Sequence, residues 1–362
     1  MTHENYILYL KGTIDTYPSK TKKHINKLFT DADIVKNTSQ LSLGNVSESA
    51  IDVKDLELTE KIKTCLAQNK EAIKLFEEWE FTKDYKYSVV FTCENFQQLL
   101  NNAQSLAKTM QSPSDESAMM FEYLKTPITF DSDGLFILKF NLKFAAIDPL
   151  NENEIFLKYP VLIVLHKESE LIELRFDVLK RVFIPDKKEQ SVYSDLIDDI
   201  IRYVYENLNT DLVPLDLDYL VSEVKQDSHE TRVMAEYRKL PSGGNAQLEV
   251  GNNQEYVLPI IGELKELIKK HQTELEQAPI LKEALEQFIF ENDELSDYSW
   301  IELMWENEIK TRSIRAKFIF NYRNKSYCLI QHYFNNVLIG MERMNHVIDY
   351  INAHRNITAN ED

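Results

Sequence analysis

The stretch that decides the fold is GLFILKFNLKFAAIDPLNENEIFLKYPVLIVLHKESELIELRFD, residues 134 to 177. It contains three apolar runs, separated by the turn-rich segments DPLNENE and HKESE. Segments this short suit hairpins, because a crossover between parallel strands needs about a dozen residues or more. With ITFDSD upstream and VLKRVF downstream, the sequence predicts an antiparallel meander over residues 128 to 183.

The first and last runs of this stretch alternate between apolar and polar residues. On the first run the apolar positions are Phe136, Leu138, Phe140, Leu142 and Phe144, and the polar positions are Lys139, Asn141 and Lys143. The segment ELIELRFD, residues 170 to 177, has Glu173 and Arg175 on its polar side. A period of two is typical of a sheet with one packed and one solvated face. We therefore expect a wet charged face, on which cross-strand pairs such as Lys139 with Glu173 contribute about 0.2–1 kcal/mol each.

The rest of the chain alternates between helical and hairpin patterns. Helices are expected at residues 192 to 208, near 216 to 225 and on either side of Pro279, where apolar residues recur at helical spacing. Hairpins are expected at residues 231 to 250 and 313 to 334, and the opening YILYLKG suggests a short strand.

Together these patterns predict an α+β fold, in which antiparallel meanders and hairpins are flanked by amphipathic helices. The expected organisation is two packed halves. The first, residues 1 to 208, contains the central meander, and the second, residues 209 to 362, contains two hairpins and helices.

Composition limits the classes of partner. The 362 residues include 41 Lys and Arg against 59 Asp and Glu, which gives a net charge of −18. A chain this acidic repels nucleic acid at long range, because binding a phosphate backbone depends on cations that displace counterions. Nucleic acid is therefore a disfavoured partner, unless a local basic patch overrides the net charge.

The cysteines and the apolar runs predict the compartment. Cys65, Cys93 and Cys328 lie far apart and form no CxxC or zinc-binding spacing, which favours a reducing environment. The N-terminal residues lack the pattern of a secretory signal, and no run reaches the roughly 18 apolar residues of a membrane span. We expect a cytoplasmic protein without a membrane segment.

One catalytic hypothesis follows from the polar side of the meander. Some metal-dependent nucleases place an acid on one strand and a Glu-x-Lys motif on the next, so that two carboxylates hold a cation that activates water. Asp131 or Asp133 would be the first acid and Glu173 the second, with Arg175 at the position where lysine is expected. Because arginine is permanently protonated, this match fails at its most diagnostic position.

The chain lacks the other motifs that carry chemistry. It contains no GxSxG, no GxxxxGK[ST] and no GxGxxG, and no two histidines are four residues apart. We therefore predict no cofactor and no bound metal, and we disfavour ATPase, nucleotide-dependent dehydrogenase and α/β-hydrolase functions.

A basic patch accompanies the last predicted hairpin. Arg315 and Lys317 share one face of a strand, and Arg323 and Lys325 lie at its turn beside a tyrosine. Such a hairpin can track phosphates while the tyrosine stacks on a base. The competing interpretation, favoured by the net charge, is an edge hairpin whose cations prevent aggregation.

Aromatic residues suggest a protein interface. The segment DYSWIELMWENEI, residues 297 to 309, is predicted to form a helix with Trp300, Ile301, Met304 and Trp305 on one face. Such a stripe usually packs in a core, but an exposed one would be the best interface candidate in the chain.

The leading functional hypothesis is therefore a non-enzymatic cytosolic binding or accessory protein, with a protein partner or a second copy of the chain. We also expect a bacterial or mobile-element origin, although no sequence motif supports it. The alternative is a metal-dependent enzyme that acts on nucleic acid, such as an antiviral defence nuclease.

Overall fold

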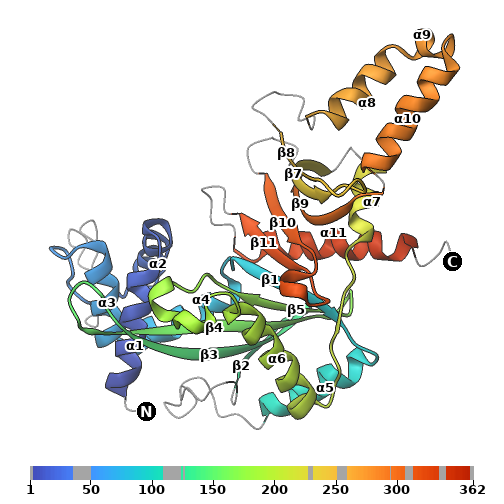
Figure 1. Cartoon of the computed structure of the whole chain (residues 1–362). Coiled ribbons are helices and arrows are strands. Elements are labelled where there is room, and N and C mark those ends of the chain that lie inside the picture. The colour runs from blue at the N-terminus through green and yellow to red at the C-terminus, as the bar shows by residue number, and fades with distance from the viewer. Residues whose placement is uncertain are drawn as a thin grey trace. The chain divides into compact units, whose positions relative to one another are not determined.

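The computed structural model describes residues 3–35, 50–108, 124, 127–226, 231–250, 259–293, 295–305, 313–333 and 340–358 (Figure 1). The chain divides into two compact units. The first comprises Met1–Tyr85, Phe91–Val213 and Leu338–Met341, and the second comprises Lys86–Val90, Pro214–Val337 and Glu342–Asp362. The predicted α+β class with antiparallel sheet is confirmed. Division into halves at residue 208 stays a prediction.

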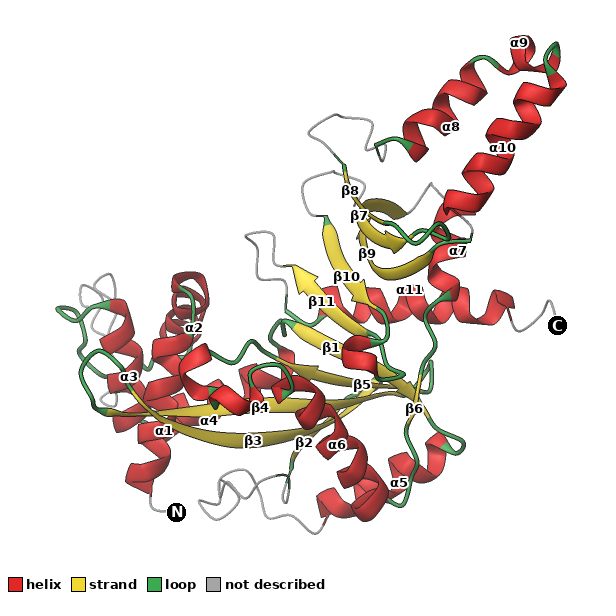
Figure 2. Ribbon diagram, viewed as in Figure 1, coloured by secondary structure: helices red, strands yellow, loops and turns green. Residues whose placement is uncertain are grey.

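The first unit contains the meander that the sequence predicts (Figure 2). Its antiparallel strands follow chain order: β2 (Ile128–Asp131), β3 (Leu135–Ile147), β4 (Glu154–His166) and β5 (Leu171–Phe176). Lys139 lies opposite Leu162, and Leu162 lies opposite Arg175. Because directly opposite residues share a face, Lys139 and Arg175 are on the same side of the sheet.

The other regular elements described in the first unit are mainly helices. They are α1 (His3–Thr16), α2 (Ser19–Asp31), α3 (Leu58–Gln68), α4 (Lys70–Thr82), α5 (Phe96–Lys108) and α6 (Val192–Leu208), with short 3₁₀ turns η2 (Arg181–Phe183) and η3 (Asp186–Lys188). The helix predicted over residues 192 to 208 is confirmed. The strand predicted at YILYLKG is wrong, because buried Tyr6, Leu10 and Ile14 recur every four residues along α1.

Both faces of the meander are covered over most of its length, and the end of β3 from Lys143 to Ile147 is partly exposed. On one side, Phe140 and Phe176 make ring contacts with Tyr203 and Tyr193 of α6. On the other side, α1 lies so close to β4 that a Cβ atom at Gly12 would be 1.7 Å from a backbone carbonyl oxygen. Only glycine allows this approach. The meander is therefore an inner layer, and this corrects the prediction of a wet face.

The second unit is also built on antiparallel strands. Its strands lie in the order β1 (Tyr87–Thr92), β11 (Leu329–Tyr333), β10 (Ile314–Ile319), β9 (Asp297–Trp305), β7 (Thr231–Lys239) and β8 (Asn245–Glu249). The two-residue strand β6 (Val213–Pro214) pairs with β1. The predicted hairpins are confirmed as the β7–β8 pair and the β10–β11 pair, which is joined by the 3₁₀ turn η4 (Tyr322–Asn324).

The helix predicted at residues 297 to 309 is wrong in its described part. Residues 297 to 305 form strand β9, paired on both sides with β7 and β10, and residues 306 to 309 lie outside the described residues. Apolar side chains occupy both faces of β9, so its pattern mimics a helical stripe. This ambiguity is the reason for the error.

The helices of the second unit are α7 (Tyr219–Gln226), α8 (Ile261–Lys270), α9 (Gln272–Glu276), α10 (Pro279–Asp293) and α11 (Glu342–Thr358). Pro279 begins α10, in agreement with the predicted break. Helix α11 packs on the sheet through Trp305, whose ring centroid is 5.1 Å from that of Tyr350. Ile301, Leu303 and Trp305 thus point into the core of this unit.

Candidate functional site

The charged row of ELIELRFD lies in the protein interior. The side chains of Glu173 and Arg175 are fully buried. Arg175 donates from Nε and Nη2 to Glu173 Oε2 at 2.8 and 2.6 Å, and His166 Nε2 lies 3.0 Å from the same oxygen. Burial alone would raise the pKa of Glu173, but Arg175 and His166 lower it to about 2. Glu173 therefore remains ionised within a closed network.

The four residues of the nuclease hypothesis do not converge. Across the sheet, Asp131 lies opposite Phe136, Phe136 opposite Leu165, and Leu165 opposite Ile172. Asp131 is therefore on the same face as Ile172, and Glu173 is on the other face. Asp131 is exposed and forms a 2.6 Å ion pair with Lys167.

Asp133 is also exposed, in the β2–β3 turn. Among the described residues, no cluster of three or more His, Cys, Asp or Glu side chains could hold a metal ion. The carboxylates therefore lack the shared cation site that the nuclease hypothesis requires.

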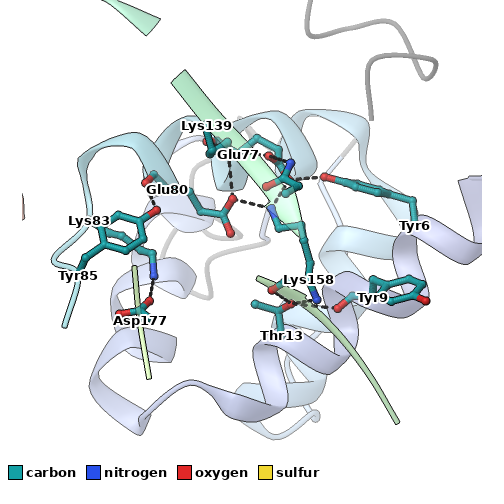
Figure 3. Close-up of polar contacts among 11 residues, drawn as sticks. Tyr6, Tyr9, Thr13, Glu77, Glu80, Lys83, Tyr85, Lys139, Lys158 and Asp177 are labelled. Carbon is teal, nitrogen blue, oxygen red and sulfur yellow. Dashed lines mark hydrogen bonds and ion pairs between the residues drawn. The ribbon is translucent and has the colours of Figure 1, made fainter. Parts of the chain in front are cut away.

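The same sheet face carries a second buried ion cluster, formed by Glu77 and Glu80 of α4 with Lys139 and Lys158 of the sheet (Figure 3). Lys139 Nζ is 2.6 Å from Glu77 Oε2 and 3.1 Å from Glu80 Oε2. Lys158 Nζ is 2.5 Å from Glu80 Oε2 and also pairs with Glu77. Two acids and two bases balance, so the cluster places no net charge in the interior.

Helix α1 closes this cluster from one side (Figure 3). The Tyr6 hydroxyl donates to Glu77 Oε1, and Thr13 Oγ1 accepts a 3.0 Å hydrogen bond from the backbone N–H of Lys158. Burial favours the neutral form of Glu77, yet Lys139 and Lys158 outweigh it and lower the pKa of Glu77 well below its ordinary value.

Because these four side chains are buried and paired with one another, we interpret the cluster as structural. A buried ion cluster of this kind adds little net stability, and we expect its role to be the selection of one strand register.

A third buried cation lies beside the cluster. Lys83 pairs with Asp177, and its ammonium lies 4.2 Å from the ring centroid of Tyr85 and 5.2 Å from that of Tyr17. Lys83 is only 5% exposed, so its own side chain fills this aromatic cage. This cage could not be predicted from the sequence, because its members come from separate helices and loops.

The sheet of the second unit has two unlike faces. The register places Trp300, Glu302, Met304, Arg315, Lys317 and Tyr333 together on one of them. We call this surface the open face. The opposite face carries Ile301, Leu303, Trp305 and Phe318, which are buried beneath or beside α11.

This division separates the three predicted interface residues. Trp305 belongs to the core at 4% exposure and Met304 is buried, whereas Trp300 is partly exposed on the open face.

Cations on the open face lie against aromatic rings. Lys317 Nζ is 3.4 Å from the ring centroid of Trp300, and Trp300 stacks on Tyr237 with a centroid distance of 6.3 Å. The Arg315 guanidinium is 5.4 Å from the Tyr333 centroid and pairs with Glu302. Partial burial lowers the pKa of Lys317. The sequence placed Arg315 and Lys317 on one face, but it did not associate either of them with Trp300.

A cavity of about 680 Å³ adjoins this face where β9 begins and β10 ends. Its lining includes the aromatic residues Tyr298, Trp300 and Tyr322, the cations Lys239 and Arg323, and the acids Asp218 and Asp297. Asn321, Arg323 and Asn324 have positive φ angles of 47°, 55° and 60°, a conformation that is uncommon for arginine. Of the predicted basic patch, Arg323 lines the cavity and Lys325 is exposed at the turn.

Helices α8 and α10 form an antiparallel pair that buries little of its apolar surface. Exposure reaches 55% for Leu267, 54% for Leu281 and 47% for Phe288. Among the described apolar residues of α8 and α10, Ile261 alone is buried. The sequence shows an apolar stripe on each helix, but a stripe does not reveal whether another element covers it.

No protein-family model matches the chain, and no curated protein shows significant sequence similarity to it. In the part of the chain that the structure describes, every helix is too short or too polar to cross a bilayer.

Proposed function

We propose that the protein is a non-enzymatic accessory protein that binds an amphipathic helix of a protein partner on its α8–α10 pair. The observation that carries this proposal is the row of large apolar side chains left exposed along these two helices. Apolar surface of this kind marks interaction sites in proteins that otherwise bury their apolar residues.

Exposed and half-buried apolar residues of the two helices form stripes with the spacing that a partner helix recognises. Leu281, Leu285 and Phe288 follow one another at four and three residues, so they lie along one side of α10. Leu264 and Leu267 provide a shorter stripe on α8. Helix α10 has 15 residues and is about 22 Å long, which gives room for about four turns of a docked helix.

The base of the pair is fixed to the sheet. Asp293, at the end of α10, is 3% exposed and accepts hydrogen bonds from Arg238 Nη1 at 2.8 Å and Lys265 Nζ at 2.5 Å. Arg238 comes from β7 and Lys265 from α8, so this carboxylate ties both helices to the second unit's sheet. A surface held in this way loses less conformational entropy on binding.

Charge argues for a basic partner and against a second copy of the chain. Residues 259 to 293 carry eight acidic against four basic side chains. Glu263 and Glu291 lie one turn from the exposed stripe, at four residues before Leu267 and three after Phe288. Two copies would bring acidic surfaces together, whereas a helix flanked by Lys or Arg would pair with them.

The test is photo-crosslinking in cells that naturally make the protein, with a benzophenone amino acid at Phe288. We expect crosslinks to one segment of another protein, an amphipathic helix flanked by basic residues. A synthetic peptide of that segment should bind the purified full chain, and binding should be lost in the variant Leu281→Asp/Phe288→Asp.

Leu150→Asp is the matched control, because Leu150 is 92% exposed on the first unit. The control should bind the peptide as the parent does. Crosslinks to the chain itself would point to self-association, and unchanged peptide binding by the double variant would refute the site.

A further inference from the structure

We propose that the open face of the second unit, with its adjoining cavity, binds single-stranded nucleic acid. This inference concerns a surface other than α8–α10 and does not rest on the proposed function. It starts from a contrast: a chain with a net charge of −18 gathers cations and aromatic rings on one sheet face.

The register sets these groups in a row. Lys317 and Arg315 follow each other along β10, with Trp300 near the first and Tyr333 opposite the second. Trp300 lies opposite Ile319 and Tyr333 lies opposite Arg315, four residues apart on β10. Four residues of a strand span about 13 Å, so the two rings lie at opposite ends of a short row of cations. Single-stranded nucleic acid binds surfaces of this kind, because bases stack on rings while phosphates follow the cations.

Two described acids accompany the cations of this track. Glu302 is paired with Arg315, and the exposed Glu249 of β8 lies on the same face near Tyr333. Lys86 adds a further cation, with Nζ 4.4 Å from the Tyr333 ring centroid. The net charge of the whole chain acts weakly here, since charges are screened over about 8 Å at physiological salt. The local excess of cations therefore decides what this face attracts.

The cavity has the volume and the polar groups to hold one base. Trp300 and Tyr322 supply ring surfaces, and the amides of Asn321 and Asn324 can donate to and accept from a base edge. Arg323 lies over the Tyr322 ring and forms no hydrogen bond with any described residue, so its guanidinium can take a phosphate.

The two acids of the cavity set the orientation of the ligand. Asp218 and Asp297 repel phosphate but accept hydrogen bonds from exocyclic amino groups or a ribose hydroxyl. Burial first, and then the charges of the neighbouring Asp216 and Asp297, raise the pKa of Asp218. A base would thus enter the cavity while the backbone stays near Arg323 and Lys317.

The experiment measures binding of fluorescein-labelled oligo(dT) and oligo(rU) 12-mers to the full chain by anisotropy, at 50 mM and 200 mM salt. We expect saturable binding that weakens with salt. Trp300→Ala should weaken it about 5- to 100-fold through the loss of one stacked base. Lys317→Ala/Arg323→Asn should reduce the slope of log K against log salt by about 1.4, because two phosphate contacts are lost.

Asparagine is chosen at position 323 because it tolerates the positive φ found there. Lys143→Ala, an exposed lysine on the first unit, is the control and should bind as the parent does. Near-ultraviolet circular dichroism of each variant verifies folding.

No binding at 50 mM salt would overturn the inference. So would parental affinity in Trp300→Ala, and so would equal competition by heparin and the unlabelled oligonucleotide, which would show polyanion attraction without base stacking.

Discussion

Strands β5 and β10 share one sequence pattern and have opposite environments. Both alternate apolar residues with charged ones, as LIELRF at 171 to 176 and IRAKFI at 314 to 319. In β5 the side chains of Glu173 and Arg175 are fully buried, whereas in β10 the Arg315 side chain is 31% exposed and Lys317 is partly exposed. Alternation thus predicts that two faces differ, without indicating which one meets water.

The two strands differ in whether helices cover the sheet face that carries their charged residues. On the face of the first unit's sheet that carries Glu173 and Arg175, α4 brings Glu77 and Glu80 onto Lys139 and Lys158, so that each of these charges has an opposite charge beside it. On β10 the cations lie on Trp300 and Tyr333. Charged residues on a covered face need opposite charges from distant segments of the chain. Charged residues on an open face can instead contact side chains of the neighbouring strands.

The largest expected effect is at the covered face. Lys139→Met leaves two buried glutamates with one lysine, and breaking a buried pair in this way costs about 3–5 kcal/mol. We expect the urea midpoint at pH 7 to fall accordingly, measured by fluorescence of Trp79 in the neighbouring α4 in a background where the other tryptophans are replaced by phenylalanine.

The matched control is Lys143→Met, four residues along the same face of β3 but exposed. Its free energy of unfolding should change by less than about 0.5 kcal/mol. Equal losses in the two variants would show that the cluster is no more important than a surface charge.

The fold was largely predictable because strand and hairpin patterns are local. The meander, helix 192 to 208 and the hairpins at 231 and 313 each depend on periodicity and nearby turns. The opening helix was missed because YILYLKG is too short to distinguish the helical period from the strand period. The helical spacing of apolar residues becomes clear only when the segment is followed to Ile14. Strand β9 was missed because a strand that is apolar on both faces resembles a buried helix.

The sites were less predictable because they depend on pairing between distant residues. Nothing in ELIELRFD shows that Glu173 would find His166 and Arg175 in a closed interior. The nuclease hypothesis stays a prediction, and the register places two of its acids, Asp131 and Glu173, on opposite faces of the sheet. The sequence indicates which residues share one face of a strand. It does not indicate whether another element covers that face, or which residues of other strands lie opposite.

Acid should weaken the covered face in a defined window. The folded-state pKa of Glu173 is lowered from 4.5 to about 2, so its ionised form stabilises the fold above pH 4.5, and this stabilisation is lost as pH falls toward 2. The loss attributable to this group is roughly 3 kcal/mol over that interval. Glu77, whose pKa is also lowered, adds to it.

Glu173→Gln tests this assignment. The variant should be less stable at pH 7, because the buried Arg175 loses its counter-charge, but its stability should fall less steeply between pH 4.5 and 2. Urea midpoints recorded at intervals across that range give the two slopes. Parallel slopes for parent and variant would assign the acid sensitivity to other carboxylates.

The smallest effect is expected at the open face. Lys317→Met keeps a long apolar side chain on the Trp300 ring and removes only the charge, whose cation–π contact is worth about 0.5–1 kcal/mol at an exposed site. No buried carboxylate loses its partner, because Glu302 pairs with Arg315. The free energy of unfolding at pH 7 should therefore fall by about 1 kcal/mol or less, measured by urea unfolding beside Lys139→Met. A fall as large as that of Lys139→Met would mean that this face is covered in the same way as the meander. The contrast between β5 and β10 would then not hold. The proposed surface for a nucleic-acid strand would also be lost.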